Sequence, residues 1–352
     1  MKRWHAGLAG PVLLLAVGGL AAAWVQQRLT QNRQAQIEQR FEAATEAVLS
    51  ALQDRMRTYE YGLRGARGAV IATSPELMDR GRFRAYMASR DLASEFPGAR
   101  GFGLIRRIPV AAEQAFLDAA RSDGWPGFSI RQISPQDRDR LVIQYLEPIE
   151  GNEAAIGLDI SSEPHRRDAA QMAVDSGSAI LSQPITLSQA AGKPGQGLLF
   201  LLPIYGAGLP LDTVSQRRKA AYGLVYAPLA MDEILQNLGA VPKGLLLRVS
   251  DAAQASGLPP LYISSRFALA SGDSPAMDRI LPVYGRPWRV EARTGADFMP
   301  PDDTLSPGGA ALLTLTTFGL LALLLYVGQL ALQRRRQGQA GMARLAAIVE
   351  SS

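Results

Sequence analysis

The chain has 352 residues, a formal net charge of +5, no cysteine and two histidines. Its length exceeds that of one small core and indicates about two domains. The absence of cysteine excludes a disulfide framework and a thiolate site, and with two histidines we expect no structural zinc, no other metal and no cofactor.

Two stretches of the sequence are long and apolar enough to cross a bilayer. Residues 7–25 contain no charged side chain and follow Lys2 and Arg3, and residues 307–332 are followed by three arginines at 334–336. A spanning helix needs about 20 apolar residues, so each stretch predicts a transmembrane helix. The first could instead be a cleaved signal peptide, because small residues follow its apolar core.

Basic residues predict the orientation of these helices. They lie before the first stretch and after the second, whereas Asp297, Asp302 and Asp303 lie just before the second. Both termini are therefore expected in the cytoplasm and the middle of the chain outside a bacterial inner membrane, although Arg28 and Arg33 argue weakly against this. An outward-facing domain would not meet nucleic acid, so we expect no nucleic-acid partner.

Residues 26–72 predict one long helix. Apolar residues recur every three or four positions from Ile37 to Val70, which is the period of a helix with one apolar stripe. A second copy of the chain is the natural partner for this stripe, and a homodimer through the stalk helix is therefore expected. The alternative is an ordinary helix that packs on the core of its own domain.

The residues that follow predict an α+β domain. Gly98, Gly101 and Gly103 do not match a phosphate-binding loop, because they precede an apolar strand at residues 102–108 and not a helix. Helical and strand patterns then alternate to about residue 205. A second, smaller unit is expected from about Lys219, beginning with a strand at residues 220–229.

Catalytic motifs are weak in this sequence. The segment at residues 175–179 is not the strained serine turn of a hydrolase, and Glu147 and Asp159 form no recognisable carboxylate pair. Asp159 lies where an apolar strand meets the start of a helix. Its carboxylate could cap that helix, or it could face a pocket and orient a ligand.

Several segments, taken in order, resemble the CHASE domain, an extracytoplasmic sensor of histidine kinases, nucleotide cyclases and plant cytokinin receptors. They are "GFGLIRRIP", "VIQYLEP", "GLDISSEPHRRDAAQMAVDSGSAILSQPITL", "GLLFLLPIY" and "YGLVYAPLAMDEIL". The resemblance covers roughly residues 60–290. It implies a stalk helix followed by two PAS-like α/β units, with the ligand held in the membrane-distal one.

The resemblance also implies ligand-binding residues. Asp159 matches a pocket aspartate of the cytokinin receptors and Leu181 matches a leucine whose backbone contacts the ligand, and Phe102, Tyr145 and Pro184 are expected nearby. The loop at residues 186–197 is longer than its family counterpart, so a further contact there cannot be placed. The last residues, 344–352, resemble the opening helix of a cytoplasmic PAS domain.

Together these patterns predict two transmembrane helices that flank a stalk helix and two PAS-like units. The expected segments are a cytoplasmic N-terminus (1–6), the first transmembrane helix (7–25), the stalk (26–72), the distal ligand-binding unit (73–215), the proximal unit (216–306), the second transmembrane helix (307–332) and a cytoplasmic linker with the start of a PAS domain (333–352). The expected function is that of a sensor which binds a small extracytoplasmic ligand and controls a histidine kinase or a cyclic-di-GMP enzyme lying beyond this segment. The alternative is a receptor for a periplasmic protein, without a small-molecule pocket.

Overall fold

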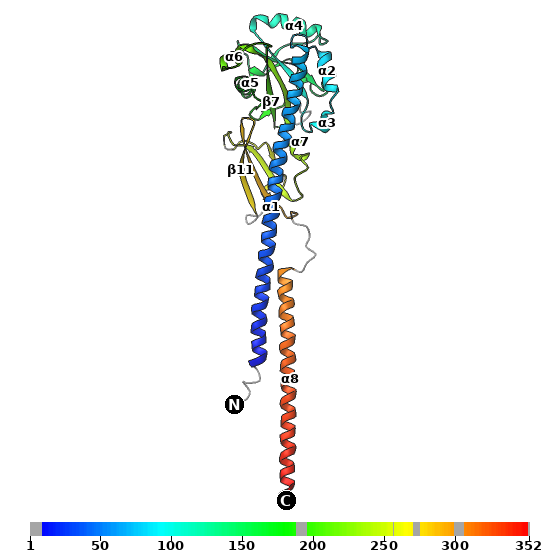
Figure 1. Ribbon diagram of the computed structural model, residues 1–352, viewed down its shortest axis with the longest axis vertical. Coiled ribbons are helices and arrows are strands. Elements are labelled where there is room, and N and C mark those ends of the chain that lie inside the picture. The colour runs from blue at the N-terminus through cyan, green and yellow to red at the C-terminus, as the bar shows by residue number, and fades with distance from the viewer. Residues whose placement is uncertain (1–8, 188–195, 256, 270–274, 299–305, 351–352) are drawn as a thin grey trace. The chain divides into compact units, whose positions relative to one another are not determined.

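The computed structural model describes residues 9–187, 196–255, 257–269, 275–298 and 306–350, which form two compact units. One unit contains the N-terminal part of α1 (Ala9–Thr73), up to Phe41, together with α8 (Pro307–Glu350). The other runs from Glu42 to Phe298 and holds both sheets of the protein. The predicted α+β class is confirmed, since long apolar helices precede and follow a β-rich domain along the chain (Figure 1).

Both helices of the first unit have the length and composition of membrane spans. Only 17% and 11% of their most apolar stretches are buried, unlike the core helix of a soluble protein. Gly18 of α1 lies against Phe318 of α8, where a Cβ atom at Gly18 would come within 2.4 Å of the Phe318 Cβ. Small residues at such contacts let two helices approach closely in a membrane. Residues 1–6, predicted to be cytoplasmic, lie outside the described residues.

The apolar stripe of α1 packs on its own domain. Val48, Leu52, Met56, Leu63 and Val70 are all at most 1% exposed in this single chain. From Val48 to Val70 the stripe therefore packs on the chain's own domain, as the alternative of a core-facing helix expects, and the homodimer stays a prediction. Burial of the stripe removes the observation on which the predicted homodimer contact was based.

The larger sheet, sheet A, has eight strands in the order β2-β4-β3-β1-β8-β7-β5, with β6 paired to β7. The β2–β4 pair is parallel and the other pairs are antiparallel. Its strands are β1 (Phe102–Ile108), β2 (Arg131–Gln132), β3 (Arg140–Glu147), β4 (Leu158–Asp159), β5 (Ile180–Leu181), β6 (Ile185–Thr186), β7 (Gln196–Tyr205) and β8 (Ala221–Ala230). The predicted strand at residues 102–108 is thus confirmed, and the glycines before it form its entry turn.

Strand β8 corrects the predicted boundary between the two units. The sequence pattern assigned it to the second, smaller unit, but β8 pairs with β1 on one side and with β7 on the other. It is therefore a central strand of sheet A. Which strands share a sheet depends on pairings between residues far apart in the sequence, and a local pattern does not reveal them.

Helices cover both faces of sheet A (Figure 1). On one face α1 approaches so closely that a Cβ at Gly62 would lie 2.6 Å from the Phe102 ring, and the ring of Phe83 in α2 lies 5.6 Å from that of Tyr145 at a tilt of 32°. On the other face α5 packs on β7. The helices and 3-10 turns of this unit, besides α1, are α2 (Arg80–Ala88), α3 (Leu92–Glu95), η2 (Val110–Ala112), α4 (Glu113–Ser122), η3 (Glu153–Ala155), η4 (Ile160–Ser162), α5 (Pro164–Ser176), α6 (Val214–Ala220), α7 (Met231–Gln236) and η5 (Phe267–Leu269).

A β-bulge in β3 decides which side chains face which helices. Leu104 of β1 is opposite Tyr145, and the next residue, Ile105, is opposite Ile143, so Gln144 is the extra residue. An extra residue shifts the alternation of side chains by one position. Tyr145 therefore lies on the α1 face of sheet A, whereas Ile143 lies on the α5 face.

The smaller sheet, sheet B, has four antiparallel strands in the order β10-β9-β12-β11. Its strands are β9 (Leu245–Asp251), β10 (Tyr262–Ile263), β11 (Ala276–Val283) and β12 (Arg286–Thr294). The turn between β11 and β12 reaches sheet A, because the backbone carbonyl of Tyr284 accepts a 3.0 Å hydrogen bond from the amide of Leu181. The Tyr284 hydroxyl donates to Glu60 of α1 over 2.7 Å.

Candidate functional site

A cleft of about 350 Å³ lies between α5 and the nearby ends of β1, β3 and β8, and we call it the α5 cleft. Its volume falls within the roughly 300–1,000 Å³ of small-molecule sites. The apolar part of its lining comes from β3, α5 and β8: Leu141, Ala170, Val174, Ala221, Gly223 and Leu224. Helix α5 forms one wall of the cleft. Glu163 caps its N-terminus, and Gly177 ends it in the left-handed conformation, as the sequence pattern predicts.

Charged side chains surround this apolar lining. The polar lining consists of Ser161, Gln171, one aspartate and four arginines. The charged residues are Asp139, Arg107, Arg138, Arg167 and Arg218. Because four cations face a single carboxylate, the lining itself has an excess of positive charge. With one acid already paired to an arginine, the cleft offers no pair of carboxylates for acid–base hydrolysis.

Two further hollows, of about 390 and 380 Å³, lie on sheet B. Their charged lining residues form ion pairs with one another or with neighbours among the described residues. These pairs are Arg248–Glu291, Arg286–Asp251, Arg289–Asp278 and Arg266–Asp297. The α5 cleft differs because Arg138 on its rim has no side-chain partner in the part of the chain that the structure describes, which makes this cleft the stronger candidate.

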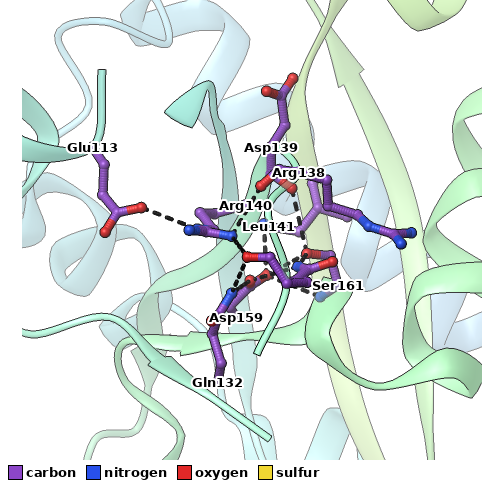
Figure 2. A network of polar contacts seen from close by, with 9 residues as sticks. Glu113, Gln132, Arg138, Asp139, Arg140, Leu141, Asp159 and Ser161 are labelled. Carbon is purple, nitrogen blue, oxygen red and sulfur yellow. Dashed lines mark hydrogen bonds and ion pairs between the residues drawn. The ribbon is translucent and has the colours of Figure 1, made fainter. Parts of the chain in front are cut away.

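Asp159 lies beside the cleft in a network of hydrogen bonds (Figure 2). Its Oδ1 accepts from the backbone amides of Leu141 at 2.9 Å and Ser161 at 3.0 Å, and from the Ser161 hydroxyl at 2.6 Å. Its Oδ2 accepts from the side-chain amides of Gln132 at 3.1 Å and Gln136 at 2.9 Å. The carboxylate is completely buried and caps η4. Asp159 thus caps the short turn η4 and not the helix that follows, α5, which Glu163 caps, and it holds Ser161, which lines the cleft.

The remaining residues implied by the resemblance are not gathered at the α5 cleft. Phe102 and Tyr145 lie on the α1 face of sheet A, where Phe102 packs edge-on against Phe96 with centroids 4.9 Å apart. The Tyr145 hydroxyl donates to Asp123 over 2.5 Å, and burial together with this hydrogen bond raises the pKa of Tyr145.

Leu181 is 1% exposed in β5 and belongs to the contact with Tyr284. Pro184 is half-buried between β5 and β6. Among the described residues that line the α5 cleft, none is one of the five that the resemblance implies. Their role in ligand binding stays a prediction. The loop at residues 188–195 lies outside the described residues.

Sequence reasoning missed the arginines of the cleft. They come from four separate segments, namely β1, the turn before β3, α5 and α6, and no local motif contains two of them. Arginine is common on protein surfaces, so a single one in a sequence carries no signal. The available clue was the helical period of α5, which places Arg167, Ala170 and Val174 on one face. The described residues hold no cluster of acidic or histidine side chains that could bind a metal ion.

Solved structures that are similar to this chain include two sensory domains, both at low identity. The periplasmic sensory domain of the Campylobacter jejuni chemoreceptor Tlp1 has 12% identity and a TM-score of 0.44, and the match covers 78% of this chain and all of that one. The ligand-binding domain of the Pseudomonas aeruginosa PAO1 amino acid chemoreceptor PctB, in complex with L-Arg, has 13% identity and a TM-score of 0.38 with the same coverage. Neither TM-score reaches 0.5, so these likenesses carry no argument about the ligand. No curated protein matches the chain.

The family comparison is more informative. The model of the CHASE domain matches residues 76–262, which is more than half of the chain, and the match begins just after α1 and ends in sheet B. It therefore includes all of sheet A and the whole α5 cleft. CHASE domains are extracytoplasmic sensors, and this chain belongs to the CHASE domain family.

Proposed function

We propose that this chain is the sensory part of a transmembrane receptor, and that a small extracytoplasmic molecule binds in the α5 cleft. The observation that carries the proposal is a cleft of small-molecule size, with an apolar lining and converging charged groups, inside a CHASE domain. The rival function, recognition of a periplasmic protein, fits a filled core better than an open cleft.

The proposal places the domain outside a bacterial inner membrane, with α1 and α8 as spanning helices and both termini in the cytoplasm. The excess of basic residues at the outer ends of the two apolar stretches supports this orientation. The controlled output would be a histidine kinase or a cyclic-di-GMP enzyme, as the resemblance implies. That residues 344–352 begin a PAS domain stays a prediction; as far as Glu350 they continue α8.

A ligand signals only when it binds two arrangements of the receptor with different affinity. Small shifts of packed helices, of about 1–2 Å, are a common form of such a change. A homodimer remains part of the proposal, as it would let the helices of two copies shift against each other. Its contacts would have to use surfaces other than the buried stripe of α1.

The test is a thermal-shift screen of metabolites with the full chain in detergent micelles. Replacing Ala221, which lines the cleft, by Phe fills part of the cleft, whereas Ala85→Phe adds the same ring to an exposed position of α2. A ligand of the cleft should raise the melting temperature of the wild type and of Ala85→Phe but not of Ala221→Phe. Stabilisation that survives in Ala221→Phe would place the ligand elsewhere. A receptor stabilised only by a periplasmic protein would support the rival function.

A further inference from the structure

The four arginines of the α5 cleft are not equivalent. Two of them are held by carboxylates: Arg107 donates two hydrogen bonds to Asp139, of 2.9 and 3.2 Å, and Arg218 donates two of 2.7 Å to Asp175. The hydrogen bonds from Arg218 lower the pKa of the Asp175 carboxyl. These two arginines are therefore already neutralised by paired acids and shape the cleft.

The other two arginines have hydrogen-bonding capacity left. Arg138 is exposed on the rim, and its guanidinium has no side-chain partner among the described residues; Figure 2 shows it pointing away from the Asp159 network. Arg167 donates one 3.1 Å hydrogen bond to the Ser161 carbonyl, and its nearest carboxylate, that of Asp168, is 3.7 Å away and 60% exposed. A guanidinium carries five N–H donors, so most of those on Arg138 and Arg167 are unused.

Arg138 and Arg167 adjoin an apolar wall. Ala170 and Val174 follow Arg167 on the same face of α5, and Leu141 and Leu224 line the cleft from the sheet. An inorganic anion would leave this wall uncovered, whereas an organic anion would cover it with carbon and direct its charge to the rim. A planar guanidinium fork matches a carboxylate in particular, because it can donate two parallel hydrogen bonds.

Given the proposed function, we infer that the ligand of the α5 cleft is a small organic carboxylate, bound through its charge by Arg138 and Arg167 and through its carbon skeleton by the apolar wall. The inference rests on the proposed function, since it assumes that a small molecule occupies this cleft. It goes further by excluding uncharged and cationic ligands.

The experiment uses the full chain in detergent micelles and a panel of carboxylates with two to eight carbons, both mono- and dicarboxylates. Each acid is paired with the uncharged amide of the same skeleton. At millimolar concentration at least one acid should raise the melting temperature and its amide should not. The affinity of that acid should fall as sodium chloride is added, because salt screens charges at an exposed rim.

The variants Arg138→Ala and Arg167→Ala should each weaken binding of that acid about tenfold or more, since hydrogen bonds to charged groups are among the strong ones. Arg279→Ala is the matched control: it removes an equal charge from an exposed ion pair on β11, outside the cleft. It should leave the affinity unchanged. Both cleft variants should melt close to the unliganded wild type, because neither arginine is buried.

The outcomes separate this inference from the proposed function. If the amides stabilise as well as the acids, and Ala221→Phe abolishes both effects, the cleft binds a ligand but the inference about charge is wrong. If acids stabilise the chain regardless of Ala221→Phe and of both arginine variants, both proposals fail. If no acid of the panel stabilises the chain, the inference is also overturned, while the wider metabolite screen still tests the function.

Discussion

Sheet A and sheet B differ in how they are covered. In sheet A seven consecutive residues of β8 are buried, because helices pack on both faces. In sheet B the residues of β9 alternate between buried and half-buried, which is typical of a sheet with one packed face. Both sheets lie in one compact unit, yet only sheet A has two core layers.

This difference indicates which sheet can hold a ligand under a helix. The α5 cleft interrupts only the core layer between α5 and sheet A. The core layer between α1 and sheet A stays packed. Sheet B has one layer, and opening it would expose the side chains that hold the sheet together. We therefore expect sheet A to bind and sheet B to respond. The following predictions, ordered from the largest expected effect to the smallest, test this division.

The largest effect is expected for the single core layer of sheet B. Trp288 of β12 is completely buried, and Trp288→Ala should lower the free energy of unfolding by about 3–5 kcal/mol. Urea unfolding of the full chain in micelles, followed by circular dichroism, measures this change. The control is Ile280→Ala on β11, where the side chain is 52% exposed and the change should stay within about 0.5 kcal/mol. Equal effects of the two substitutions would contradict a one-layer core.

The second effect concerns the edge of sheet A beside the cleft. Asp159→Ala removes an acceptor from buried and part-buried donors of Leu141, Ser161, Gln132 and Gln136, and it should cost about 2–4 kcal/mol in the same assay. Asp168→Ala, at an exposed position of α5, should have almost no effect. An Asp159→Ala domain as stable as the wild type, but unable to bind ligand, would favour the predicted role of Asp159 as a ligand contact over its role as a cap.

The third effect is a small gain of stability on the α5 face of sheet A. The Tyr226 hydroxyl is fully buried and has no hydrogen-bond partner among the described residues. Tyr226→Phe removes this unsatisfied group and should stabilise the domain by about 1 kcal/mol at neutral pH. Tyr61→Phe, where the side chain is 65% exposed, is the control and should change nothing. A loss of stability in Tyr226→Phe would mean that the hydroxyl has a partner in solution.

The same tyrosine predicts a dependence on alkaline pH. Burial raises the pKa of Tyr226, so above pH about 10 the unfolded chain releases this proton while the folded domain keeps it. The unfolded state then binds fewer protons, and stability falls as pH rises, by about 1.4 kcal/mol per pH unit for each such group. Urea titrations between pH 9 and 12 should give a shallower fall for Tyr226→Phe than for the wild type. Parallel curves would contradict this prediction.

The sequence allowed much of the local structure to be predicted. The strand at residues 102–108 has the predicted ends, and α5 begins after Glu163 and ends at Gly177, because these features depend on residues adjacent in sequence. The order of CHASE motifs predicted the family correctly. Asp159 was correctly placed at the end of a strand and the start of a helical turn, and both of its possible roles were recognised.

Features that depend on distant residues could not be predicted. The donors that saturate Asp159 include Gln132 and Gln136, which are more than 20 residues away in the sequence. The bulge at Gln144 moves Tyr145 to the face opposite the cleft, and nothing in the sequence around it marks an extra residue. The arginines of the cleft come together only when four segments fold against one another.

The turn at Tyr284 has a mechanical consequence. Its backbone is held at a positive φ of 45°, which a residue with a large side chain rarely adopts, and it is bound to β5 through the Leu181 amide and to α1 through Glu60. Eight residue pairs join β11 to β12, which makes this hairpin stiff. A displacement of β5 must therefore either break the hydrogen bond between Leu181 and Tyr284 or tilt the β11–β12 hairpin. Thr294, at the far end of β12, is the last residue of sheet B before α8 in the sequence, so a tilt of the hairpin would displace the point from which the chain continues to α8.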